Sequence, residues 1–310
     1  MSKIHEALKR AAEERISKAG SGSISGLVEL SGQERLAGIE PTPDAARLAS
    51  VQRKRSDAGK VGLEEFVKRC VPSNWKFEPA ASVFSAHLSH EVGAEKFRTL
   101  RSRLYQIAAA QPLKKILVTS SIPAEGKTFV AANLAQSFIR QSGRRVLLID
   151  SDLRASRLHL HLGAKAKPGL SDYLSGECDE FQVTQAGNNG NLCLIPGGRE
   201  VSNPSELLHS DRMKQLLEQM ASHFDWVILD SPPALAVHDA SILADMCDGV
   251  LFIVRAGSTD FELAEKATAE FQEKNLVGVV LNRVERSDAY GDYYYSGYGT
   301  SKNRETEPES

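Results

Sequence analysis

Short, continuous apolar runs separated by longer amphipathic segments constrain the fold of this chain more than any other feature. Runs of this kind are apolar on both faces, as are the strands of a parallel sheet that helices cover on both sides. Their regular alternation with helical patterns predicts an α/β fold with a doubly wound, mainly parallel sheet. The expected strands are 116–118, 146–149, 192–195, 226–229, 250–254 and 277–281, and the expected helices include 128–141, 205–222, 240–246 and 260–274.

Changes in polarity along the 310 residues predict three regions. Residues 1–87 begin with a short charged helix up to about Lys18, and a Gly/Ser-rich linker and a poorly ordered polar stretch follow. Residues 88–287 contain all the expected strands and form the expected globular domain. Residues 288–310 have no apolar periodicity, so we expect a flexible tail.

The composition narrows the class of protein. A formal net charge of −2 supplies no global basic field, so we expect no nucleic-acid partner. No apolar stretch reaches the roughly 18 to 20 residues that span a bilayer, and the N-terminus lacks the apolar run of a secretion signal. The four cysteines have no zinc-like spacing, which favours free thiols in a reducing compartment. We therefore expect a cytoplasmic protein, although docking on a membrane protein is compatible with these features.

A phosphate-binding loop is predicted between the strand 116–118 and the helix 128–141, where the chain reads S-S-I-P-A-E-G-K-T. Backbone N–H groups at such a strand–loop–helix junction cradle phosphate oxygens. Lys127 would reach the β- and γ-phosphates of ATP, and the Thr128 hydroxyl would bind Mg²⁺. The expected nucleotide contacts come from Ser121, which replaces the usual first glycine of this motif, and from Pro123, Ala124, Glu125, Gly126, Lys127 and Thr128.

Carboxylates follow two of the expected strands: Asp150 and Asp152 follow 146–149, and Asp230 follows 226–229. Ligands of open parallel sheets bind beyond the carboxyl ends of the strands, so these side chains should converge on the phosphates. There they can bind Mg²⁺ or accept a proton from an attacking hydroxyl. The alternative is that they only cap turns.

The expected catalytic residues are Lys127, Asp150 and Asp152, and the expected metal ligands are Thr128, Asp150 and Asp230. Arg154, two residues after Asp152, either contacts phosphate or pairs with a carboxylate, and the sequence leaves that choice open.

Five of the seven tyrosines lie within nine residues of the tail: Tyr290, Tyr293, Tyr294, Tyr295 and Tyr298. Rings in a flexible segment have no core to join, so we interpret the cluster as a set of phosphoacceptors. The alternative is a recognition tail. Each added phosphate carries about −1.5 to −2 charge, so heavy phosphorylation would disrupt an oligomer held together by tail binding.

Together these motifs resemble the bacterial tyrosine kinases of exopolysaccharide and capsule synthesis, which are relatives of the partition and division-site ATPases. The matching elements are the phosphate loop, D-S-D-L-R at 150–154 and D-S-P-P at 230–233, and the resemblance covers about residues 88–300. It implies a tyrosine autokinase that assembles into a ring-like homo-oligomer. Within this oligomer the kinase phosphorylates its tail in trans, and it regulates polysaccharide synthesis or export. It also implies a membrane chain-length regulator, or polysaccharide co-polymerase, as activator, and the opening residues 1–8 resemble those of members encoded apart from that activator.

Further elements extend the resemblance. Glu95, Arg98 and Arg101 fit an E-x-x-R-x-x-R element that mediates ring assembly in the family, although a solvated charged stripe is the alternative. The stretch N-P-S-E-L-L at 203–208 also matches. Asn282 lies where relatives contact adenine.

Two rival functions share the motifs. One is an ATPase switch of the partition or division-site type, which Ile122 disfavours because those proteins carry a second lysine at that position. The other is a non-catalytic nucleotide-binding scaffold in polysaccharide export. Neither accounts for both the tyrosine cluster and the intact phosphate-site residues.

Overall fold

The computed structural model describes residues 64–84, 91–187 and 190–284. The predicted N-terminal helix, the linker and the tyrosine cluster lie outside the described residues. The predictions made for them, and the predicted limits of the three regions, therefore stay predictions.

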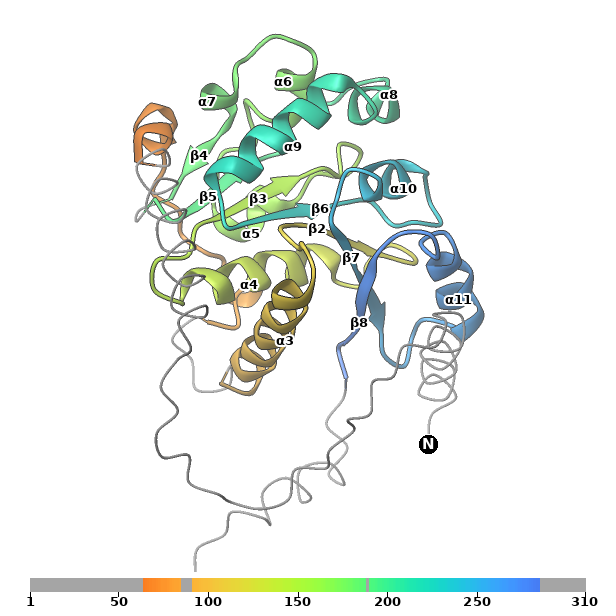
Figure 1. Ribbon diagram of the computed structural model, residues 1–310. Helices are drawn as coiled ribbons and strands as arrows, with labels where there is room; N and C mark the ends of the chain where they lie inside the picture. The colour runs from red at the N-terminus through yellow and green to blue at the C-terminus, as the bar shows by residue number, and fades with distance from the viewer. Residues whose placement is uncertain (1–63, 85–90, 188–189, 285–310) are drawn as a thin grey trace, which may run out of the picture. The chain divides into compact units, whose positions relative to one another are not determined.

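A single mainly parallel sheet forms the centre of the described part (Figure 1). Within the described residues it has eight strands in the order β1-β4-β5-β3-β6-β2-β7-β8, and only the pair β4–β5 is antiparallel. The predicted doubly wound, mainly parallel fold is confirmed, and each of the expected apolar runs forms a strand. The strands are β1 Val71–Pro72, β2 Lys115–Ser120, β3 Val146–Asp150, β4 Gln185–Ala186, β5 Leu192–Ile195, β6 Trp226–Asp230, β7 Gly249–Arg255 and β8 Leu276–Asn282.

Helices cover both faces of the sheet: α3 and α4 lie on one face, and α8 and α9 lie on the other (Figure 1). No helix of the described part is long and apolar enough to cross a membrane. The helices are α3 Glu91–Ala110, α4 Lys127–Ile139, α5 Leu158–Leu162, α6 Leu170–Leu174, α7 Glu180–Val183, α8 Pro204–Leu208, α9 Asp211–His223, α10 Asp239–Ala244 and α11 Phe261–Ala269, with a short helical segment at 64–69 and the 3-10 turn η1 Pro79–Ala81.

Alternation along each central strand explains why the apolar runs are continuous. Successive side chains of a strand point to opposite faces of the sheet. In β2, Leu117 belongs to the core beneath α9 and α10, whereas Ile116 and Val118 belong to the core beneath α3 and α4. Both faces are buried under helices, so both sets of positions are apolar over Ile116–Val118.

Two segments differ in detail from the expectation. The predicted helix 205–222 is divided into α8 and α9, because the Ser210 hydroxyl accepts a hydrogen bond from Met213 N and begins a new helix there. Residues 64–84, assigned from sequence to the polar N-terminal region, supply β1 and the buried side chains of Phe66 and Trp75. This edge of the sheet is formed by β1, which has two residues and is too short to show a periodic pattern in the sequence.

Candidate nucleotide and phosphoryl-transfer site

The phosphate loop connects the end of β2 to the first residue of α4, as the motif predicts. Ala124 and Gly126 adopt positive φ angles of 67° and 96°. At Gly126 a Cβ atom would lie 2.1 Å from Nδ2 of Asn282, so only glycine fits there. The Ser121 hydroxyl is buried in the loop and has no hydrogen-bond partner among the described residues. A loop with an unsatisfied donor and a helix N-terminus beside it is suited to bind phosphate oxygens.

Lys127, the first residue of α4, forms a buried ion pair in this site. Its Nζ lies 3.0 Å from Oδ2 of Asp152, and the side chains are 14% and 5% exposed. Burial lowers the pKa of Lys127, but the carboxylates of Asp230, Asp152 and Asp150 outweigh it and the net pKa is raised. The ammonium is thus held charged by the three carboxylates that sequence analysis expected around it.

Asp150 and Asp230 end two neighbouring strands and are register partners in the β3–β6 ladder. Oδ2 of Asp150 accepts hydrogen bonds from Ser156 Oγ at 2.7 Å and from Leu158 N at 3.0 Å. Burial raises the pKa of Asp150 to about 6, against the lowering effect of these two hydrogen bonds. Burial raises the pKa of Asp230 to about 7, although Lys127 lowers it. Both groups therefore titrate near neutral pH, which suits proton transfer or cation binding.

The donor set around Asp230 fits a magnesium–nucleotide complex. Oδ1 of Asp230 is buried without a partner among the described residues, and the Thr128 side chain is hydrogen-bonded to this carboxylate. The described part contains no cluster of three or more His, Cys, Asp or Glu side chains that would hold a metal alone. Mg²⁺ typically takes one or two protein carboxylates together with substrate phosphate oxygens, and this arrangement meets that pattern.

Arg154 pairs with a carboxylate, which decides the choice left open by the sequence. Its Nε lies 2.9 Å from Oδ2 of Asp239, and its Nη2 donates to Ser205 Oγ at 2.9 Å. Asp239 is fully buried at the start of α10, and Ser205 belongs to the N-P-S-E-L-L stretch. The network links the loop after β3 to α8 and α10. Sequence analysis missed Asp239 and Ser156, because neither stands in a recognisable motif.

Glu125, within the phosphate loop, and Asn282, at the end of β8, make hydrogen bonds that the sequence did not predict. The Glu125 carboxylate is 1% exposed and accepts a hydrogen bond from Ile122 N at 2.8 Å. Asn282 Nδ2 donates to the Glu125 carbonyl oxygen at 2.8 Å. The side chain of Glu125 is thus engaged inside the protein, and its contact with a nucleotide would come from the backbone.

The E-x-x-R-x-x-R element lies on α3, but its members have different surroundings. Glu95 and Arg98 form an exposed ion pair with 2.8 Å between Oε2 and Nη1. Arg101 instead donates from Nη1 to the Ser137 carbonyl oxygen of α4 at 2.6 Å. Of these three side chains, Arg101 is therefore held by α4, whereas Glu95 and Arg98 pair with each other at the exposed surface.

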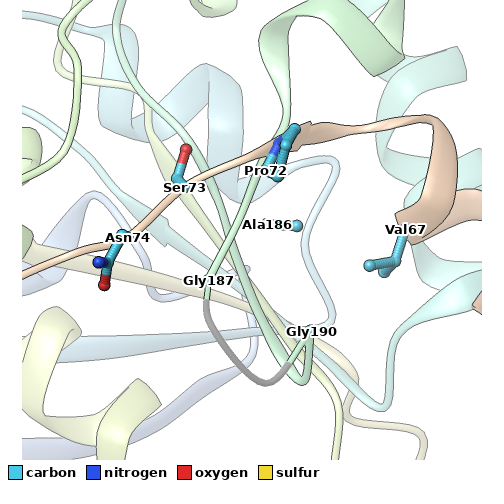
Figure 2. A pocket seen from close by; sticks show the side chains of 7 residues that line it. All are labelled: Val67, Pro72, Ser73, Asn74, Ala186, Gly187 and Gly190. Atoms are coloured by element: carbon cyan, nitrogen blue, oxygen red, sulfur yellow. The ribbon is translucent and has the colours of Figure 1, made fainter.

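A hollow of about 620 Å³ lies elsewhere, at the β1–β4 edge of the sheet (Figure 2). Figure 2 shows around it residues of the 64–69 segment, of β1 and the two residues after it, of β4, and two glycines between β4 and β5. No candidate site residue and no titratable side chain lines it. Its lining is Val67, Pro72, Ser73, Asn74, Ala186, Gly187 and Gly190.

Comparison with known proteins agrees with this geometry. The family model described as the CobQ/CobB/MinD/ParA nucleotide binding domain matches residues 116–296. The tyrosine-protein kinase YwqD of Bacillus subtilis is 36% identical over 214 residues, which cover 68% of this chain and 89% of that protein. The chain belongs to the CobQ/CobB/MinD/ParA nucleotide-binding family and, within it, to the bacterial tyrosine kinases.

Longer members of the tyrosine-kinase family match over part of their length. The tyrosine-protein kinase wzc of Salmonella typhimurium is 36% identical over 211 residues, which cover 67% of this chain and 29% of that protein. The chain thus spans less than a third of this longer kinase.

Solved structures of tyrosine-kinase domains share the fold. The kinase domain of the Escherichia coli tyrosine kinase ETK is 34% identical, with a TM-score of 0.58, and the match covers 63% of this chain and 78% of that domain. The chimerical protein CapA2B2 is 28% identical, with a TM-score of 0.61, and the match covers 68% of this chain and 96% of that protein.

Proposed function

We propose that this chain is an ATP-dependent protein-tyrosine autokinase that phosphorylates its own C-terminal tyrosine cluster in trans within a homo-oligomer. The observation that carries the proposal is the convergence of Lys127 with three buried carboxylates at the carboxyl ends of β2, β3 and β6. Membership of the tyrosine-kinase family supports the reaction class. The acceptors in the proposal are Tyr290, Tyr293, Tyr294, Tyr295 and Tyr298.

Each group around the phosphate loop has a proposed role in this transfer. ATP with Mg²⁺ supplies the phosphoryl group and the cation that neutralises it. Lys127 neutralises charge on the β- and γ-phosphates, and Thr128 and Asp230 orient the cation. A tyrosine hydroxyl forms the new O–P bond, ADP leaves, and Asp150 accepts the phenol proton. Asp152 keeps Lys127 in place until phosphate arrives.

The partners in the proposal follow from the family resemblance. A membrane chain-length regulator would activate the kinase, so that the chain works at the cytoplasmic side of the inner membrane and regulates exopolysaccharide synthesis or export. The exposed Glu95–Arg98 pair on α3 is the proposed contact between subunits. Asn282 is proposed to contact adenine, since it already lies beside the phosphate loop.

A mixing experiment tests the proposal. One chain keeps the active site but carries phenylalanine at all five tail tyrosines, and the other carries Lys127→Met with its tyrosines intact. The two are incubated together with ATP and Mg²⁺, and each chain is then weighed by intact-mass spectrometry.

Phosphate on the Lys127→Met chain alone is the expected result, because only that chain offers acceptors and only the other one transfers. If ATP is hydrolysed but neither chain gains mass, with or without a chain-length regulator added, the kinase proposal is wrong and the ATPase switch replaces it.

A further inference from the structure

The carboxylate of Glu125 is hydrogen-bonded both within the phosphate loop and to the turn after β7, and we call this connection the Glu125 brace. A buried carboxylate is costly unless it is hydrogen-bonded, and Glu125 is 1% exposed. Its Oε2 accepts from Ile122 N at 2.8 Å, which closes the loop upon itself. Its Oε1 accepts from Arg255 N at 3.3 Å and from the Thr259 hydroxyl. One side chain therefore joins the loop to the turn that follows β7.

The turn after β7 is itself fixed to the neighbouring strand. Thr259 N donates to the Arg255 carbonyl oxygen at 3.1 Å, and Ala256 N donates to the Asn282 carbonyl oxygen at 2.9 Å. Asn282 completes the connection through its side-chain bond to the Glu125 carbonyl oxygen. The ends of β7 and β8 thus hold the loop from one side.

The position of this brace matters for nucleotide binding. Glu125 stands between Ala124 and Gly126, both at positive φ, and two residues before Lys127, the first residue of α4. A non-glycine residue at positive φ is strained and persists only where its surroundings impose it. The hydrogen bonds of Glu125 hold the backbone next to Ala124 in this conformation.

We propose that Glu125 is a positioning residue whose carboxylate, with Thr259 as its partner, holds the phosphate loop in its nucleotide-binding shape. The inference rests on the proposed function only in that the loop binds a nucleotide. It makes the turn 255–259, which carries no recognised motif, part of the nucleotide site.

The test compares Thr259→Val, Thr259→Ser and Glu125→Gln in the full chain. Binding of fluorescently labelled ADP with Mg²⁺ is titrated without phosphoryl transfer, and hydrogen exchange of the loop peptide is measured without nucleotide. Thr268→Val is the matched control, because its hydroxyl donates to the Ala264 carbonyl oxygen inside α11 at 2.8 Å and touches no loop residue.

The expected result is a dissociation constant raised about tenfold by Thr259→Val and by Glu125→Gln, as the loss of a hydrogen bond to a charged group predicts. Thr259→Ser and Thr268→Val keep the original affinity, and exchange in the loop rises only in Thr259→Val and Glu125→Gln. Unchanged affinity in Thr259→Val, even with faster exchange, overturns the inference, and so does an equal loss in Thr268→Val.

The readout separates this inference from the kinase proposal. A chain that binds nucleotide through a Glu125-braced loop yet never phosphorylates a tyrosine contradicts the proposed function and leaves the brace standing. A chain that binds no nucleotide contradicts both.

Discussion

Lys127 Nζ and Asp152 Oδ2 lie 3.0 Å apart beyond the carboxyl ends of β2 and β3. The carboxylate of Asp152 thus engages the ammonium group that a bound phosphate would need. The other carboxylate oxygen of Asp152, Oδ1, accepts a hydrogen bond from Ala155 N at 3.0 Å within the loop after β3. Nucleotide phosphates and Asp152 therefore compete for one ammonium group.

The substitution Asp152→Asn tests that competition. Without the carboxylate, Lys127 is free to meet phosphate, so the affinity for ADP measured without Mg²⁺ should rise several-fold. Tyrosine phosphorylation should fall by about 10²-fold, because Lys127 loses the carboxylate that keeps it in place. Calorimetric titration and a phosphorylation time course check the two effects. Weaker binding of metal-free ADP would contradict the competition.

The pKa of Asp150 is expected to set the acidic side of the pH–rate profile. Its pKa is raised to about 6 by burial, so it loses its ability to accept a proton as pH falls through that value, and the rate should fall about tenfold per pH unit below it. Ser156→Ala removes a hydrogen bond that lowers this pKa, and the fall should therefore begin at higher pH. Initial rates measured from about pH 5 to pH 8 check both. An identical profile for Ser156→Ala would contradict the assignment of Asp150.

The buried carboxylate of Asp230 is expected to lower the free energy of unfolding while it favours binding of the magnesium–nucleotide complex. Its folded pKa of about 7 exceeds the unfolded value of about 3.9, so the ionised form costs stability in full above about pH 7, and this cost shrinks as pH falls below 7 and is gone below the unfolded pKa. Asp230→Asn should stabilise the nucleotide-free chain by about 1–3 kcal/mol at about pH 8. It should also weaken binding of ADP with Mg²⁺.

Thermal unfolding of Asp230→Asn in nucleotide-free buffer at two pH values checks this. Asp211→Asn is the control, because that side chain is 89% exposed and the change should stay within about 0.5 kcal/mol. A stabilisation that is the same at low pH would contradict the ionised state assigned to Asp230.

Arg98 and Arg101 of α3 should separate assembly from folding. Arg98→Ala removes an exposed ion pair and should leave the free energy of unfolding within about 0.5 kcal/mol, while lowering the oligomer mass measured by light scattering. Arg101→Ala loses the bond to Ser137 and should cost about 1 kcal/mol. Lys214→Ala, which breaks a similar exposed pair on α9, should change neither. An unchanged mass in Arg98→Ala would contradict the proposed subunit contact.

The site was predictable where side chains follow strands with strong apolar patterns. Asp150 and Asp230 end runs that both faces of the sheet bury, and parallel strands bring their carboxyl ends together. The phosphate loop needed only a strand before it and a helix after it. The sequence therefore sufficed for the fold class and for the placement of Lys127 among carboxylates.

The parts that were missed depend on tertiary contacts without a local signal. Strands β1 and β4 have two residues each, which is too short for a period of two to show. Glu125 occupies a variable position of the motif, and nothing local indicates that Thr259, 134 residues away, receives its side chain. Asp239 is likewise recognisable only once Arg154 lies beside it.

The most direct test of the account is intact-mass spectrometry of the purified chain after incubation with ATP and Mg²⁺, alongside Lys127→Met, with the added phosphates mapped by fragmentation. The account predicts several added phosphates, all between Tyr290 and Tyr298, and none on Lys127→Met. Phosphates that map only to other residues, or that persist in Lys127→Met, would contradict it.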